Sequence, residues 1–125
     1  MTSLTYQVGV PAWEGGKTTL VVRADGAVHV DNERAGAARR EYDGTVAPAD
    51  VGALFTQAQA LGLWTTARRA TAVPDEAPVT LELSVGGVVA HRVDLWDNQL
   101  RQGPLAPIHA RLDGIVRAVS GGEVY

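Results

Sequence analysis

The stretch TLVVRADGAVHVD, residues 19–31, decides the fold class of this chain. Extended apolar runs lie on both sides of Asp25-Gly26, which is typical of two half-buried strands joined by a tight turn. A two-residue turn would mix the apolar and polar faces, whereas a three-residue turn at residues 24–26 keeps them apart. The stretch therefore predicts an antiparallel hairpin with four side chains on one buried face: Leu20, Val22, Val28 and Val30.

A second stretch, TLELSVGGVVAHRVD at residues 80–94, follows the same plan of an apolar run, a glycine-containing turn and another run. A three-residue turn at Val85-Gly86-Gly87 places His91 on the apolar face. We therefore expect His91 to lie under the helices as a structural residue. The same face should carry these side chains: Val79, Leu81, Leu83, Val89, Val93 and Leu95.

Each hairpin is followed by a segment with helical periodicity. In APADVGALFTQAQALGLW, residues 47–64, apolar residues recur at intervals of three and four between Pro48 and Gly62. The segment PLAPIHARLDGIVRAVSGG, residues 104–122, has the same periodicity and stops at its two glycines. Between the first hairpin and the first helix, RREYDG at residues 39–44 is polar and suits an edge strand.

These elements predict one α+β domain over residues 1–125. We expect an antiparallel sheet of four to five strands with two helices packed on one face, in the order hairpin, strand, helix, hairpin, helix. The segment TTARRATAVPDEAP, residues 65–78, lacks periodicity and predicts a loop. The expected core contains Leu20, Val22, Val28, Val30, Leu54, Phe55, Leu61, Leu81, Leu83, Val93, Leu112, Ile115 and Val116.

The composition excludes several classes of function. Eleven Lys and Arg against fourteen Asp and Glu give a net charge of −3, so the broad basic field of a nucleic-acid-binding protein is missing. The chain has no cysteine, which excludes disulfides, thiol nucleophiles and thiolate metal sites. The start MTSLTYQVGV lacks the basic and apolar regions of a signal peptide. We therefore expect a cytoplasmic protein that binds neither membranes nor nucleic acid.

Motifs for catalysis or for metal binding are missing. The three histidines lack helical metal-ligand spacing, with His29 expected to face solvent, and no serine lies in a nucleophile elbow. Residues 15–18, GGKT, resemble the end of a phosphate loop, but the GxxxxGK spacing is absent and a strand follows. We therefore expect a protein that is not an enzyme, with no catalytic residue, no cofactor and no metal.

The stretch DLWDNQL, residues 94–100, is chiefly the end of a strand, because Asp97-Asn98 are preferred turn residues. It has too few carboxylates for a calcium loop. Trp96 falls in the outward phase of the strand, and Trp13 lies in the Gly-rich PAWEGG loop, so both are candidate aromatic anchors for a partner protein. The predicted contact residues are Trp13, Arg92, Trp96 and Asp97, whereas Trp64 is expected to fill the core.

The run from WEGGKTTLVV through APADVGALFTQAQALGLW to PDEAPVTLELSVGGVVAHRV and PLAPIHARLDGIVRAV resembles the emfourin-type domains, small bacterial protein inhibitors of thermolysin-like metalloproteases. It is equally similar to a wider group of small α+β domains with this plan. The first hairpin and the polar strand after it are longer than in emfourin. The resemblance spans residues 13–119 and implies a non-catalytic protein-binding module, with a protease inhibitor as one form, but it transfers no inhibitory residue.

Two other classes of function stay open. A small-molecule-binding or enzymatic domain would have a pocket between the sheet and the helices, with His91 reaching into it. An immunity-type or structural interaction protein would instead show only a flat acidic or aromatic face.

Overall fold

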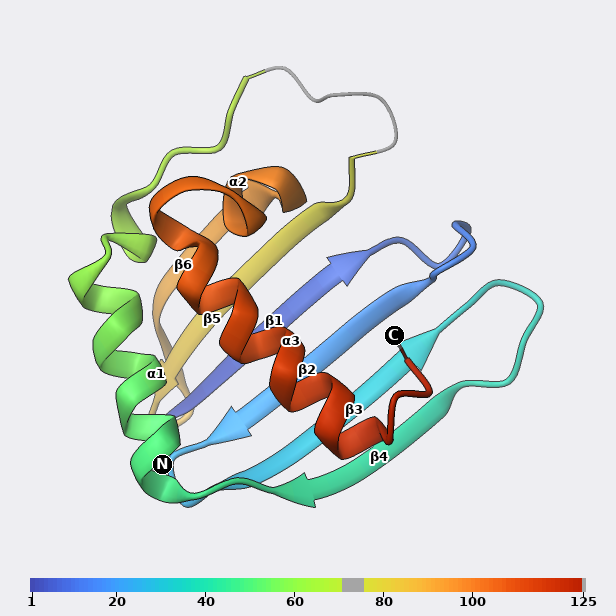
Figure 1. Cartoon of the computed structure of the whole chain (residues 1–125), viewed down its shortest axis with the longest axis horizontal. Helices are drawn as coiled ribbons and strands as arrows, with labels where there is room; N and C mark the ends of the chain where they lie inside the picture. Colours follow the sequence, from blue (N-terminus) through green and yellow to red (C-terminus); the bar gives the residue numbers. More distant parts are fainter. Residues whose placement is uncertain (71–75, 125) are drawn as a thin grey trace.

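The structure is a computed structural model that describes residues 1–70 and 76–124. The described chain forms one open antiparallel sheet of six strands in the order β4-β3-β2-β1-β5-β6, with α1 and α3 lying across the same face (Figure 1). The elements are β1 (Ser3–Gly9), β2 (Lys17–Arg23), β3 (Ala27–Glu33), β4 (Arg40–Thr45), α1 (Pro48–Ala60), β5 (Pro78–Val85), β6 (Val88–Trp96), α2 (Asp97–Arg101) and α3 (Ala106–Ser120), with 3-10 turns at Leu63–Thr65 and Gly103–Leu105.

This architecture confirms the α+β class and the antiparallel sheet, but the expected four to five strands and two helices are too few. The missing strand is β1, which lies in the middle of the sheet and pairs with β2 on one side and β5 on the other. Its sequence alternates Leu4, Tyr6 and Val8 with polar residues, which is the pattern of a half-buried strand. The additional helix is α2, a five-residue segment that begins where DLWDNQL leaves the sheet. The expected loop at residues 65–78 lies partly outside the described ranges.

The first hairpin has the predicted register. Val22 pairs with Val28 across a three-residue turn, and Gly26 in that turn has a φ of 94°. A Cβ atom at Gly26 would lie 2.2 Å from the Val46 carbonyl oxygen, so only glycine fits there. As expected, β4 forms one edge of the sheet.

The second hairpin differs from its prediction. Its turn has two residues, Gly86-Gly87, and an irregularity between the Leu83 and Ser84 pairs inserts one extra residue into β6. Val89 therefore pairs with Ser84 and is 50% exposed, contrary to the expectation that it faces the core. The bulge returns His91 to the apolar face opposite Leu83, but at this end of the edge strand the contact with Trp64 covers its ring only in part. His91 is consequently exposed rather than buried.

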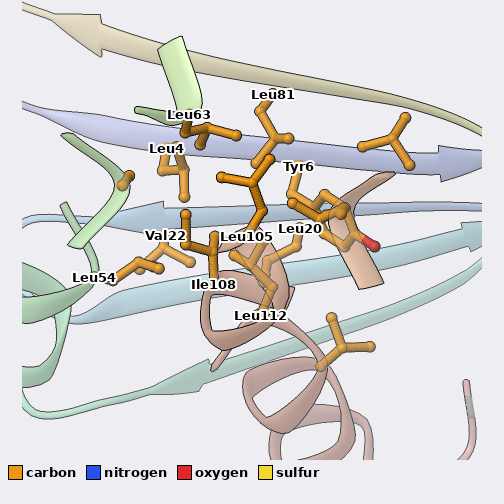
Figure 2. Packing of buried hydrophobic residues seen from close by; sticks show 14 of the residues in the cluster. Leu4, Tyr6, Leu20, Val22, Leu54, Leu63, Leu81, Leu105, Ile108 and Leu112 are labelled. Atoms are coloured by element: carbon orange, nitrogen blue, oxygen red, sulfur yellow. The ribbon is translucent and has the colours of Figure 1, made fainter. Parts of the chain in front are cut away.

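The core lies between the sheet and the helices. Leu105, Ile108 and Leu112 of the C-terminal helical segment lie over Leu20 and Tyr6 of the sheet (Figure 2). One row of paired residues crosses all six strands: Tyr42, Val30, Leu20, Tyr6, Leu81 and Val93.

Four residues of the expected core are only partly buried: Phe55, Leu61, Leu83 and Ile115. Phe55 illustrates the reason, because neighbouring residues on a helix are turned about 100° from each other and Leu54 takes the direction of the core.

Trp64 packs partly buried against the core, as expected, and its ring stacks on that of His91 with the centroids 5.5 Å apart. None of the helices in the described ranges combines the length and apolar character needed to cross a bilayer.

Candidate protein-binding site

The four predicted contact residues lie in two places. Trp13 and Asp97 line one hollow of about 190 Å³ at the end of the sheet where β1 turns into β2. Arg92 and Trp96 lie in the same phase of β6, on the face opposite α1 and α3, which we call the outer face. The structure therefore brings Trp13 and Asp97 together and places the other two residues along one edge strand.

The segment between β1 and β2, residues 10–16, is here called the Trp13 loop. It is folded on itself, because the Trp13 amide donates a hydrogen bond to the Val10 carbonyl (3.2 Å) and the Gly16 amide donates to the Trp13 carbonyl (2.9 Å). The Trp13 side chain is nevertheless 43% exposed. The loop thus combines a fixed backbone with an exposed indole.

Two neighbouring segments hold this loop from outside. The Ala35 amide, in the connection between β3 and β4, donates to the Pro11 carbonyl (2.8 Å). The Asn32 side chain, only 1% exposed as a residue, donates to the Gly15 carbonyl (3.0 Å) and to the Thr18 hydroxyl (3.1 Å). Buried polar groups that are bonded in this way fix the backbone around them.

Asn32 is itself part of a larger polar network that the sequence interpretation missed. The Arg40 guanidinium donates to the Asn32 side-chain oxygen (3.2 Å) and to the Glu123 carbonyl (2.9 Å), which joins the loop to the segment after α3. The sequence does contain a signal for this network, because Thr18 and Asn32 are polar residues at positions of β2 and β3 that alternate onto the inward face. A buried polar residue at such a position needs a partner, and the partners of Asn32 lie in the Trp13 loop, β2 and β4.

A second hollow, of about 340 Å³, lies beside Trp13 and is lined by the loop and by the connection between β3 and β4. Its lining includes Glu14 and Arg34, so it carries one charge of each sign. In the first hollow, Asp97 accepts a hydrogen bond from Arg101 Nε at 2.7 Å. Trp13 therefore borders two recesses with charged residues near each.

Trp96 has partners within the chain. Its indole N–H donates to the Arg69 carbonyl (3.0 Å), and the Arg68 guanidinium lies 3.9 Å from the ring centroid in a cation–π contact. These contacts hold residues 68–69 against β6 and give the outward-facing indole a structural role. Contact of Trp96 with a partner protein stays a prediction.

Arg92 belongs to a row of charged residues on the outer face. Its guanidinium pairs with Glu82 (3.0 Å) and, more distantly, with Asp94 (3.5 Å), while the Thr80 hydroxyl donates to Asp94 at 2.7 Å. The hydrogen bond from Thr80 is the main reason that the pKa of Asp94 is lowered, and Arg92 contributes through a hydrogen bond and its charge. The charged form of Asp94 is therefore favoured in the folded chain.

This arrangement predicts a pH-dependent effect of Thr80→Val. The variant loses the hydrogen bond to the carboxylate, so its free energy of unfolding at pH 7 should fall by about 0.5–1.5 kcal/mol. A carboxyl group with a lowered pKa stabilises the fold at pH values above 3.8, its ordinary pKa. This contribution is lost as the pH falls through the pKa that the group has in the folded chain. Urea unfolding of both proteins should therefore show a gap at pH 7 that narrows near pH 2. A gap of constant size would contradict this role of Asp94.

A further hollow, of about 350 Å³, lies between α1 and α3 and not, as the alternative enzymatic interpretation expects, between the helices and the sheet. It is lined by Val46, Asp50, Leu54, Ala110, Arg111, Gly114, Ile115 and Ala118, a set without His91. Arg111 Nε donates to the Gln57 side chain at 2.8 Å, so this cation is already bonded within the fold.

No protein-family model and no curated protein matches this chain. Among the described residues, the Trp13 loop combines a hydrogen-bonded backbone with a large exposed aromatic side chain.

Proposed function

We propose that the chain is a non-catalytic protein-binding module that contacts its partner through the Trp13 loop, and that the partner is a protease which it inhibits. The observation behind this proposal is the combination found in residues 10–16. The loop backbone is hydrogen-bonded internally and to residues 32 and 35, while Trp13 is 43% exposed.

A fixed loop favours binding because little conformational entropy is lost when a partner encloses it. Tryptophan is among the residues that contribute most to protein interfaces, commonly ~2 kcal/mol or more when it is enclosed. The two hollows beside Trp13 offer space for partner side chains, and Glu14, Arg34 and Asp97 supply charges around them. The loop therefore has the parts of a small contact surface: a central aromatic residue, recesses and a charged rim.

A protease is the proposed partner for two reasons. The sequence pattern resembles that of emfourin-type inhibitors of thermolysin-like metalloproteases. In addition, a loop whose backbone groups are already bonded within the fold resists the extended conformation that a protease imposes on a substrate, so it can occupy the enzyme without being cut. Both reasons favour an inhibitor over a substrate.

Thermolysin is the first enzyme to test. Increasing amounts of the chain should reduce its hydrolysis of a small fluorogenic peptide until a one-to-one mixture is inhibited, and mass spectrometry should find the chain intact afterwards. Full activity at a large excess of the chain, or cleavage between residues 10 and 16, would contradict the proposal.

A further inference from the structure

A second group of functional side chains lies on the outer face, away from the Trp13 loop. The register of β3 and β4 pairs His29 with Asp43 and Asp31 with Glu41, and all four alternate with residues that face the core. The neighbouring strand β2 presents Val21 and Thr19 opposite His29 and Asp31, so it adds no titratable group here.

Three of these residues have metal-ligating atoms that lie close together. One donor atom from each of His29, Asp31 and Glu41 lies within 4.8 Å of the others. His29 Nε2 lies 3.4 Å from Glu41 Oε1. Ligands at zinc distances of 2.0–2.1 Å in a tetrahedral site are about 3.3–3.5 Å apart. The histidine and the glutamate are therefore already at the separation that such an ion requires.

The fourth residue orients the histidine. His29 Nδ1 lies 2.7 Å from Asp43 Oδ1. In the tautomer that carries the proton on Nδ1, this N–H donates a hydrogen bond to the carboxylate. The remaining ring nitrogen, Nε2, is then an acceptor directed at Glu41. Histidines that bind metal commonly donate their other N–H to a carboxylate in this manner, because the bond fixes the tautomer and raises the basicity of the ligand.

The charge of the cluster also favours a cation. Three carboxylates, those of Asp31, Glu41 and Asp43, surround His29. Among the ion pairs of the described residues, the cation on this cluster is Arg39, which contacts Asp31 at 2.9 Å. Asp31 is 7% exposed, whereas more than half of the Arg39 side chain is in solvent. Arg39 can therefore move aside, and a divalent ion could replace it as the partner of the buried carboxylate.

We propose that His29, Asp31 and Glu41 bind one divalent transition-metal ion, with Asp43 as the positioning residue behind His29. An imidazole with two carboxylates suits zinc and its neighbours, whereas Mg²⁺ and Ca²⁺ require a larger set of oxygen ligands. Three protein ligands leave a coordination position for water or an external group. This site is independent of the proposed protease binding, and either can fail alone.

Calorimetric titration of the full chain with ZnCl₂ at pH 7.5 tests the proposal. We expect one ion per chain, with no comparable heat from MgCl₂. His29→Ala and Glu41→Gln should abolish binding or weaken it more than tenfold, and Asp43→Asn should weaken it by about 10–100-fold. Arg39→Gln should bind more tightly than the wild type, because it removes the cation that competes for Asp31.

Two matched measurements complete the test. His91→Ala removes an exposed histidine from another strand and should leave zinc binding unchanged. Metal ligands must be deprotonated to bind, so protons should compete with zinc and binding should weaken at pH 5.5. Absence of one-to-one zinc binding, or equal affinity in the folded His29→Ala variant, would overturn the proposal and leave His29 as a cation held by carboxylates.

Discussion

Replacing Tyr6 by alanine is expected to lower the free energy of unfolding by about 3–5 kcal/mol, the range for truncation of a buried aromatic residue. Tyr6 is 1% exposed and is among the largest fully buried side chains of the chain. It lies on β1 between Leu20 of β2 and Leu81 of β5. Its loss would leave a cavity in β1, the strand between the two hairpins, beneath the C-terminal helical segment (Figure 2).

Phe55→Ala is the matched control for this prediction. Phe55 is also aromatic, but it is only partly buried at the margin of the helix layer, so its truncation should cost less. Urea unfolding of both variants against the wild type gives the comparison. An equal or larger loss in Phe55→Ala would show that β1 is not the centre of the core.

Gly16→Ala should produce the second large effect, at the base of the Trp13 loop. Gly16 has a φ of 69°, and a Cβ atom there would lie 2.5 Å from the Glu33 carbonyl oxygen and 2.4 Å from Arg34 Cγ. The left-handed backbone costs an alanine about 1–2 kcal/mol. Overpacking of a well-filled site costs about 1–3 kcal/mol more, so a total loss of about 2–5 kcal/mol is expected.

Gly36→Ala separates these two contributions. Gly36 has a similar φ of 76°, but nothing lies within 4 Å of an added Cβ atom. This variant should therefore lose only the backbone part, about 1–2 kcal/mol. If thermal or urea unfolding shows equal losses in the two variants, the close approach of the loop base to β3 does not constrain the loop.

The elements that could be predicted from the sequence are those with a clear periodicity of apolar residues and with glycine at the turn or helix end. The first hairpin, β4 at the edge and the two long helices follow from local pattern, which acts within a few residues. The position of β1 at the centre could not be predicted in the same way, because it depends on pairing with β5, more than 70 positions away. The bulge in β6 is similar, since one inserted residue exposes Val89 while leaving His91 in phase.

The candidate sites likewise combine residues that local sequence predicts with contacts that depend on long-range pairing. Trp13 could be predicted as an exposed loop residue from its residue type and its Gly-rich surroundings, and it does lie exposed in a loop. The network through Asn32 and Arg40 that holds this loop joins it to β2, β3, β4 and the segment after α3, so only the folded chain brings it together. The cluster of His29, Asp31 and Glu41 was missed because ligand spacing was sought along a helix, whereas these residues meet across the β3–β4 register.

The most direct test of the proposed function compares inhibition constants for thermolysin among the wild type, Trp13→Ala and Val88→Ala. Val88 is 69% exposed at the tip of the β5–β6 hairpin, at the opposite end of the sheet, and serves as the control for general apolar contact. We expect Trp13→Ala to weaken inhibition about 30-fold, which corresponds to ~2 kcal/mol, with Val88→Ala unchanged. A folded Trp13→Ala protein that inhibits as strongly as the wild type would contradict the assignment of the Trp13 loop as the binding site.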